Sequence, residues 1–389
     1  MSFAVNAAVA QVEAPPIMEA QSWIRPGLRN RALLNLCQAV PSYPPAAELE
    51  AEVARVALVP GTSLYTDIFG IPELRGKLAE HMSADYGGTI SPDEVCITAG
   101  CNQAFAASLM ALAKAGDNII VPVPYFFNHT MWFAMLGLEA RFIPAFQGGM
   151  SWPGVADAAA LIDGRTRAIV LCSPNNPTGA IYPPDVIDGF FDLAITRGIA
   201  LVIDETYKDF RADPAPPHGI FARPDWQEGF VHLYSFSKVF SMTGYRTGSI
   251  IAGTGFLAEI EKILDCMSIC APHISQRAAL FGLTSLDGWK RDKTGLMGGR
   301  LEALRRAFER PGLRYRLESS GALFAYVRHP FEGEPAKQVA QRLAGEHDVL
   351  CLPGSMFGPG QEQHLRIAFA NAEASDMETL VDRLMESQG

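Results

Sequence analysis

The chain has 389 residues, of which 48% are hydrophobic and 19% are charged, and its formal net charge is −10. Glycine and proline are spread along the chain, so the composition excludes a disordered or collagen-like protein and supplies material for a sizeable core. The acidic balance, with no Lys/Arg-rich run, argues against a nucleic-acid-binding surface.

The stretch up to about Pro45 is punctuated by proline and reads as an arm. No Lys or Arg precedes Arg25, so a secretory signal peptide is not expected. The apolar runs are much shorter than the roughly 20 residues that span a bilayer. The seven cysteines form neither a CxxC pair nor a metal-ligand spacing. We therefore expect a soluble, cytoplasmic protein with buried free thiols, no bound metal and no membrane contact.

Beyond this arm, helical and strand patterns alternate. Helical periodicity covers residues 46–58 and 71–87, and it returns at 101–116 and 183–198. Short apolar strands are predicted at residues 94–100, 118–124, 140–145, 167–174, 199–205 and 230–237. Strands that alternate with helices favour βαβ units and a mostly parallel sheet.

The C-terminal part has a different order of elements. A helical segment near residues 297–310 leads to apolar or periodic stretches at 322–330, 336–354 and 364–370, and a polar helix starts at about Ala374. These patterns predict a smaller α+β domain. The predicted division is an N-terminal arm with part of the small domain at 1–44, a large domain at 45–289 and a C-terminal small domain at 290–389.

Polar residues gather where the predicted strands end, which is where open α/β sheets bind ligands. Asp204 and Glu205 close one strand, and they are interpreted as a helix cap, a solvated acid or a partly buried anion. Asn175 and Asn176 follow another strand in CSPNNPTGA, a turn sequence whose amides can also donate to a ligand oxygen. In ITAGCNQAF, a glycine opens a helix whose free N–H groups suit a phosphate.

The stretch LYSFSKVFSMTGYRTG, residues 233–248, carries one lysine among apolar and small residues. An apolar setting disfavours the ammonium form, so Lys238 is either a surface lysine after a strand or an amine nucleophile that forms a Schiff base. Ser235 and Ser237 can donate to phosphate oxygens, and Arg246 offers a bidentate fork. With the nearby carboxylate and amide, these groups are what a pyridoxal phosphate (PLP) site needs.

These motifs, in this order, resemble the class I/II aminotransferases, which are fold type I PLP enzymes. The resemblance runs from about Leu34 to the RIAFA segment near the C-terminus. It implies a large domain with a mostly parallel sheet in αβα layers and a smaller α+β domain. It also implies a ping-pong enzyme that moves the α-amino group of an L-amino acid to a 2-oxo acid.

The resemblance assigns a role to each matched residue. Lys238 would form the Schiff base with PLP and carry the proton, and Asp204 would face the pyridine nitrogen. Tyr207 and Asn176 would contact the phenolic oxygen of the ring, and Phe126 would stack on it. The phosphate would be held by Gly100, Cys101, Asn102, Ser235, Ser237 and Arg246.

Two further residues complete the assignment. Arg366 in LRIAFA would bind the α-carboxylate of the substrate, with help from Asn176 and from the loop that contains Ala39. Tyr65 would reach the phosphate in the neighbouring subunit of a homodimer, the commonest symmetric assembly.

Four positions depart from the family pattern. Cys37 and Ala39 stand where the substrate-side loop usually has glycines, and the methyl group of Ala39 would tighten the approach of the substrate. Thr247 replaces an apolar residue, and His129 stands where a tyrosine is common. None of these changes removes a catalytic group, so they bear on substrate preference.

Two alternatives stay open on these motifs. A C–S or β-lyase uses the same lysine, aspartate and asparagine on the same scaffold. A regulatory protein with this fold would carry an N-terminal DNA-binding module, for which the short arm and the negative charge leave little support. Because no second arginine for a distal carboxylate is evident, we expect neutral, hydrophobic or aromatic amino acids as substrates.

Overall fold

The computed structural model describes residues 3–24, 31–146 and 151–389. Within these residues, seven strands form a sheet in the order β2-β8-β7-β6-β5-β3-β4. The strands are β2 (Val95–Thr98), β3 (Asn118–Val123), β4 (Glu139–Pro144), β5 (Thr166–Cys172), β6 (Ala200–Asp204), β7 (Phe230–Ser235) and β8 (Gly248–Ala252). Neighbours from β7 to β4 pair in parallel, whereas β8 is antiparallel to β2 and β7. The predicted α/β class with a mostly parallel sheet is confirmed.

Strand β6 illustrates how this sheet is buried on both faces. Leu201 and Ile203 belong to one apolar cluster, and Ala200 and Val202 belong to another. Successive side chains of a strand point to opposite faces, and a sheet covered on both faces needs apolar residues at nearly every position. The near-continuous apolar run of β6 is therefore the expected sequence of a central strand.

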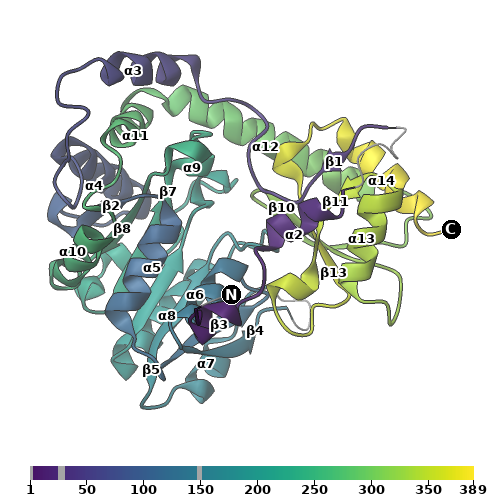
Figure 1. Cartoon of the computed structure of the whole chain (residues 1–389), viewed down its shortest axis with the longest axis horizontal. Coiled ribbons are helices and arrows are strands. Elements are labelled where there is room, and N and C mark those ends of the chain that lie inside the picture. Colours follow the sequence, from purple (N-terminus) through teal and green to yellow (C-terminus); the bar gives the residue numbers. More distant parts are fainter. Residues whose placement is uncertain (1–2, 25–30, 147–150) are drawn as a thin grey trace.

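Helices cover both faces of the sheet, and α12 runs from beside α11 to the smaller part of the molecule (Figure 1). The helices of the described chain are α1 (Ala7–Ala10), α2 (Pro16–Ser22), α3 (Ala47–Ala57), α4 (Pro72–Tyr86), α5 (Cys101–Leu112), α6 (Phe127–Met135), α7 (Val155–Leu161), α8 (Pro184–Arg197), α9 (Phe236–Val239), α10 (Thr254–Ser268), α11 (His273–Ser285), α12 (Asp287–Phe308), α13 (Ala336–Glu346) and α14 (Asp376–Glu386). Helices α4, α8 and α11 pack into one apolar cluster of the sheet, and α5, α6 and α10 pack into the other.

The smaller part is built on a second, antiparallel sheet with its own core. Its strands follow the order β12-β13-β10-β9. Their bounds are β9 (Arg316–Gly321), β10 (Phe324–Arg328), β12 (Leu352–Pro353) and β13 (His364–Ala368). The core of this part combines residues of the two central strands with Leu304 of α12, Val339 of α13 and Leu380 of α14. Strand β1 (Leu34–Asn35) pairs with β11 (Val349–Leu350), which attaches the N-terminal segment here.

The two parts touch through bare backbone at a pair of glycines. A Cβ atom built on Gly179 would lie 2.3 Å from the backbone N of Gly321, and one built on Gly321 would lie 2.3 Å from the carbonyl oxygen of Gly179. Gly179 follows β5, and Gly321 ends β9, so this contact joins the large sheet to the small one. No side chain fits between them.

The predicted helices at 46–58, 71–87, 101–116 and 183–198 correspond to α3, α4, α5 and α8, each of them shorter than its sequence pattern. The sequence analysis did not predict β8, which packs antiparallel without a crossover helix. The domain boundaries at 44/45 and 289/290 stay predictions. None of the helices in the described part of the chain is both long and apolar enough to cross a membrane.

Candidate active site

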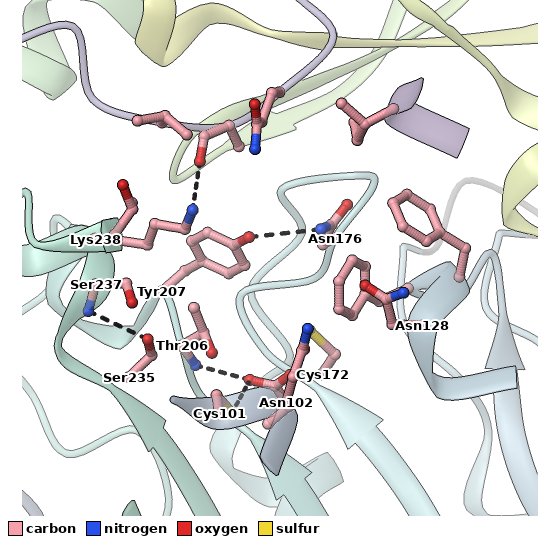
Figure 2. A pocket seen from close by; sticks show the side chains of 18 of the residues that line it. Cys101, Asn102, Asn128, Cys172, Asn176, Thr206, Tyr207, Ser235, Ser237 and Lys238 are labelled. Carbon is pink, nitrogen blue, oxygen red and sulfur yellow. Dashed lines mark hydrogen bonds between the residues drawn. The ribbon is translucent and has the colours of Figure 1, made fainter. Parts of the chain in front are cut away.

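A cavity of about 470 Å³ lies where the carboxyl ends of β5, β6 and β7 face the smaller part. Figure 2 shows Lys238, Tyr207 and Asn176 on one side of this space and Thr206, Cys101 and Asn102 on another. Of the residues assigned from the sequence, those that line it are Ala39, Cys101, Asn102, Phe126, Asn176, Asp204, Tyr207, Ser235, Ser237, Lys238, Arg246 and Arg366.

Lys238 lies on the short helix α9, directly after β7. Its Nζ donates to the carbonyl oxygen of Ala39 at 2.7 Å (Figure 2). Burial, followed by the charges of Arg246 and Arg366, lowers the pKa of Lys238 to about 8. An amine with this pKa is neutral in about a tenth of the molecules at pH 7, far more than an ordinary lysine, so it can serve as a nucleophile and as a base.

Asp204 ends β6 and is buried beneath the cavity. Its Oδ1 accepts a hydrogen bond from the backbone N of Thr206 at 3.0 Å, and its Oδ2 lies 3.2 Å from Nε2 of His129. The Cys101 thiol is 3.7 Å from Oδ1. Burial on its own would raise the pKa of Asp204, but His129 and Thr206 outweigh it and hold the pKa below its usual value. The site therefore contains a buried anion.

Glu205 points to the opposite face of the sheet from Asp204. Its Oε2 accepts from the Tyr86 hydroxyl and lies 2.9 Å from Nε2 of His232. Burial would raise the pKa of Glu205, but His218 and His232 hold it well below the usual value. The two adjacent carboxylates thus serve different places: Asp204 belongs to the cavity, and Glu205 belongs to the core.

Arg366, Asn176 and Tyr207 form a connected group at the side of the cavity nearest the small sheet. Nη1 of Arg366 donates to Oδ1 of Asn176 at 3.1 Å, and Nδ2 of Asn176 is 3.5 Å from the Tyr207 hydroxyl. Burial lowers the pKa of Arg366 to about 10, which leaves it charged at neutral pH, and burial raises the pKa of Tyr207. Nε of Arg366 is buried and has no hydrogen-bond partner among the described residues. This guanidinium has donor capacity left for a carboxylate.

A second cationic group of the lining comes from the turn between β7 and β8. Arg246 is exposed there, adopts φ 55°, and donates from Nη1 to the Thr243 carbonyl at 3.0 Å. Ser235 caps α9 by accepting from the backbone N of Ser237 at 3.2 Å, so its own O–H remains a donor. Gly100 precedes α5 at φ 86°, and a Cβ there would lie 2.3 Å from Nη2 of Arg246.

Two assigned residues are not in the cavity lining. Gly100 is covered by the Arg246 guanidinium, because a Cβ atom on Gly100 would lie 2.3 Å from Nη2 of Arg246. Tyr65 is 75% exposed and does not line the cavity of its own chain. Two of the departures differ in their contacts. The carbonyl of Cys37 accepts a hydrogen bond from Nη2 of Arg366, whereas Oγ1 of Thr247 is buried without a partner in the described chain.

The sequence analysis missed several residues of this site. His129 was noted only as a departure, although it contacts Asp204 and stacks on Phe105 with ring centroids 4.1 Å apart. The other lining residues not assigned from the sequence are Ile17, Gln38, Val40, Phe127, Asn128, Cys172, Thr206, Thr243 and Gly244. Thr206 could have been found, because the backbone N–H two residues after an Asp commonly donates a hydrogen bond to that Asp side chain. Ile17 lies on α2 in the arm and has no local signal.

Known proteins share this architecture. The crystal structure of an aspartate aminotransferase from Thermotoga maritima superposes with a TM-score of 0.89 at 26% identity, covering 99% of this chain and 100% of that one. The fold is that of the fold type I PLP-dependent aminotransferases.

Sequence comparison gives the same assignment. An aromatic aminotransferase of Arabidopsis thaliana is 28% identical over 359 residues, covering 90% of this chain and 88% of that protein. An arginine–pyruvate transaminase of Pseudomonas aeruginosa is 29% identical over 325 residues, covering 80% and 79%. The family model for aminotransferase class I and II matches residues 31–384. The chain belongs to the class I and II aminotransferase family and is an aminotransferase.

Proposed function

We propose that this aminotransferase uses PLP and transfers the α-amino group of a neutral, hydrophobic or aromatic L-amino acid to a 2-oxo acid. The observation that carries the proposal is one cavity with a lysine of lowered pKa, a buried anion and two arginines, Arg246 before β8 of the large sheet and Arg366 on β13 of the small sheet. The relatives named above act on different amino acids, so their names do not select a substrate.

The residues present fit PLP, the cofactor of this family. A phosphate would find donors in Ser235, Ser237, Arg246 and the first backbone N–H groups of α5. Because Gly100 has no side chain, the Arg246 guanidinium can lie directly against its backbone. The low pKa of Asp204 keeps a negative charge where a protonated pyridine nitrogen needs one.

PLP, when bound, supplies a sink for the electrons released when the Cα–H bond of the substrate breaks. Lys238 in its neutral form accepts the Cα proton on Nζ and later returns a proton to the substrate. Arg366 binds the α-carboxylate of the substrate with its free donor capacity and so orients the Cα–H bond. Asn176 and Tyr207 present hydrogen-bond donors to the ring oxygen, and Phe126 offers an aromatic face to the ring.

The wall left for the substrate side chain supports a neutral substrate. Beyond the groups assigned to the cofactor and the α-carboxylate, the lining includes the apolar Ile17, Val40 and Phe127 and the amides of Gln38 and Asn128. The other unassigned lining residues are Cys172, Thr206, Thr243 and Gly244, and none of them is a Lys or Arg. Within the described lining, every Lys or Arg already has one of these assignments. A distal carboxylate would therefore be desolvated here without a counter-charge.

We also propose a homodimer in a reducing compartment such as the cytoplasm. Tyr65 and its neighbours Leu58 and Leu64 are exposed, 75%, 86% and 67% respectively, which suits a surface covered by a second subunit. All seven cysteines are free thiols.

The test is a titration of the PLP-loaded protein with single amino acids in the absence of an oxo acid. We expect the visible absorbance of the cofactor to change stoichiometrically and to recover only when a 2-oxo acid is added, with leucine or phenylalanine more effective than aspartate. Release of ammonia and oxo acid with unchanged absorbance would indicate a lyase instead. Lys238→Ala should abolish both the absorbance and the activity, whereas the exposed Lys262→Ala is the matched control.

A further inference from the structure

Arg300 is a buried arginine that does not line the cavity. It lies on α12 and is 1% exposed. Removing a guanidinium from water is costly, and an apolar side chain of similar volume often stabilises a core equally well. The contacts of Arg300 therefore need an explanation beyond packing.

The hydrogen bonds of Arg300 join two segments that are far apart in the sequence. Nη1 donates to the carbonyl oxygen of Ala370 at 2.7 Å, and Nη2 donates to Oγ of Ser42 at 2.9 Å. Nη2 also forms a 2.5 Å ion pair with Glu373, whose Oε1 accepts from the Ser42 hydroxyl at 3.1 Å. The backbone N of Ser42 donates to the same Ala370 carbonyl at 3.2 Å. Arg300 thus closes a ring of contacts around Ser42 and Ala370.

Each of these segments leads directly into the substrate end of the cavity. The 38–43 loop contributes Gln38, Ala39 and Val40 to the lining. The other segment follows β13, the strand that carries Arg366. The two are also joined next to the cavity, because the backbone N of Val40 donates to Oδ1 of Asn371 at 3.0 Å.

We propose that Arg300, acting through Ser42 and the Ala370 carbonyl, is a positioning residue that sets the spacing between the 38–43 loop and Arg366. This inference rests on the proposed function, because it assigns the substrate carboxylate to Arg366. Ser235, Asp204 and Arg246, which are assigned to the cofactor, lie at the ends of strands of the large sheet or next to them and, within the described chain, make no hydrogen bond to Arg300, Ser42, Ala370 or Glu373. Within the same residues, Lys238 reaches the 38–43 loop only at the carbonyl oxygen of Ala39. Loss of the ring should therefore weaken substrate binding and leave cofactor binding unchanged.

The decisive variants change Ser42 and keep Arg300 in place, and a third variant changes Arg300 itself. Ser42→Ala removes the hydroxyl that Nη2 contacts, and Ser42→Thr restores a hydroxyl there. Arg300→Lys keeps the charge but removes the fork that reaches two acceptors. The matched control is Arg305→Met, because Arg305 lies on the same helix and its bonds go to Glu302 and Ser320.

We expect Ser42→Ala to raise KM for both the amino acid and the 2-oxo acid by about 3- to 10-fold, the effect of one hydrogen bond. Its kcat and its Kd for PLP should stay within about twofold of wild type. Arg300→Lys should raise KM further, and Ser42→Thr and Arg305→Met should behave like wild type.

The inference is overturned if KM is unchanged in Ser42→Ala, or if KM, kcat and PLP affinity deteriorate together as they would in a loosened fold. If Arg300→Lys does not fold, Ser42→Ala decides alone. A wild-type protein that binds PLP without transaminating any amino acid would overturn the proposed function first, and the positioning role with it.

Discussion

Lys238 differs from an ordinary lysine because its surroundings disfavour the ammonium form. Burial lowers its pKa from 10.5 to about 8, with added contributions from two arginines of the cavity. The neutral amine fraction therefore increases as the pH rises through about 8. The unfolded chain binds more protons than the folded one between about pH 8 and 10.5. Across that window the contribution of Lys238 to the free energy of unfolding increases with pH, and it is lost below about pH 8.

The rate at which unloaded protein captures PLP should follow the titration of this amine. We expect the rate to rise with pH with a midpoint near 8, measured by stopped-flow absorbance at constant ionic strength. Nα-acetyl-lysine, reacted with PLP under the same conditions, is the reference and should keep a midpoint near the ordinary lysine value. A midpoint near 10.5 for the protein would contradict the lowered pKa.

Residue types at strand ends could be predicted from the sequence, but their mutual contacts could not. Twelve of the fourteen residues assigned from the sequence line one cavity. The sequence did not reveal that His129 contacts Asp204, because residues 75 positions apart meet only through the packing of α6 against the end of β6. It also could not separate Asp204 from Glu205 by environment, since both end the same apolar run.

The turn between β2 and α5 is the element in which backbone space matters most. Gly100→Ala would place a methyl group 2.3 Å from Nη2 of Arg246, in addition to the strain at φ 86°. We expect Arg246 to be displaced and the Kd for PLP to rise by about tenfold or more, because one charge-assisted phosphate contact is weakened. Equilibrium dialysis with PLP measures this change.

A substitution at a second glycine, Gly116, distinguishes the effect of the steric clash with Arg246 from the effect of backbone strain. Gly116 has φ 89°, and a Cβ there would meet nothing within 4 Å. Gly116→Ala should therefore destabilise the fold by about as much as the strain alone, roughly 1 kcal/mol, without a change in PLP affinity. Equal losses of PLP affinity in the two variants would show that Arg246 is not the reason.

At the level of elements, the sequence pattern predicted α3, α4, α5, α8 and the parallel strands, because their apolar residues recur with a regular period or form short continuous runs. It did not predict α10 and α11, although both are long. It failed for β8, a five-residue strand that begins with Gly248 and pairs antiparallel with both of its neighbours. It also failed for α6, where an aromatic-rich stretch gives no clear period. Such elements are determined by the neighbours they pack against, and a single sequence does not contain that information.

The whole molecule has separate apolar cores for its two sheets, and the groups assigned to the cofactor come from the large one. PLP should therefore slow amide hydrogen exchange in β5, β6 and β7 much more than in β9 and β10. Exchange followed by mass spectrometry measures this difference, with Lys238→Ala as the control in which the effect shrinks. Equal protection of both sheets would contradict it.

The contact between Gly179 and Gly321 has a consequence for the spacing of the two sheets. Since bare backbone meets bare backbone there, the two sheets are already as close as the chain allows at this point. A methyl group at position 321 would clash with the backbone at Gly179 and push the two segments apart, and a larger side chain would push them further apart. Gly321 therefore fixes how closely the backbone after β5 approaches β9, and any side chain at this position would force one of the two to shift.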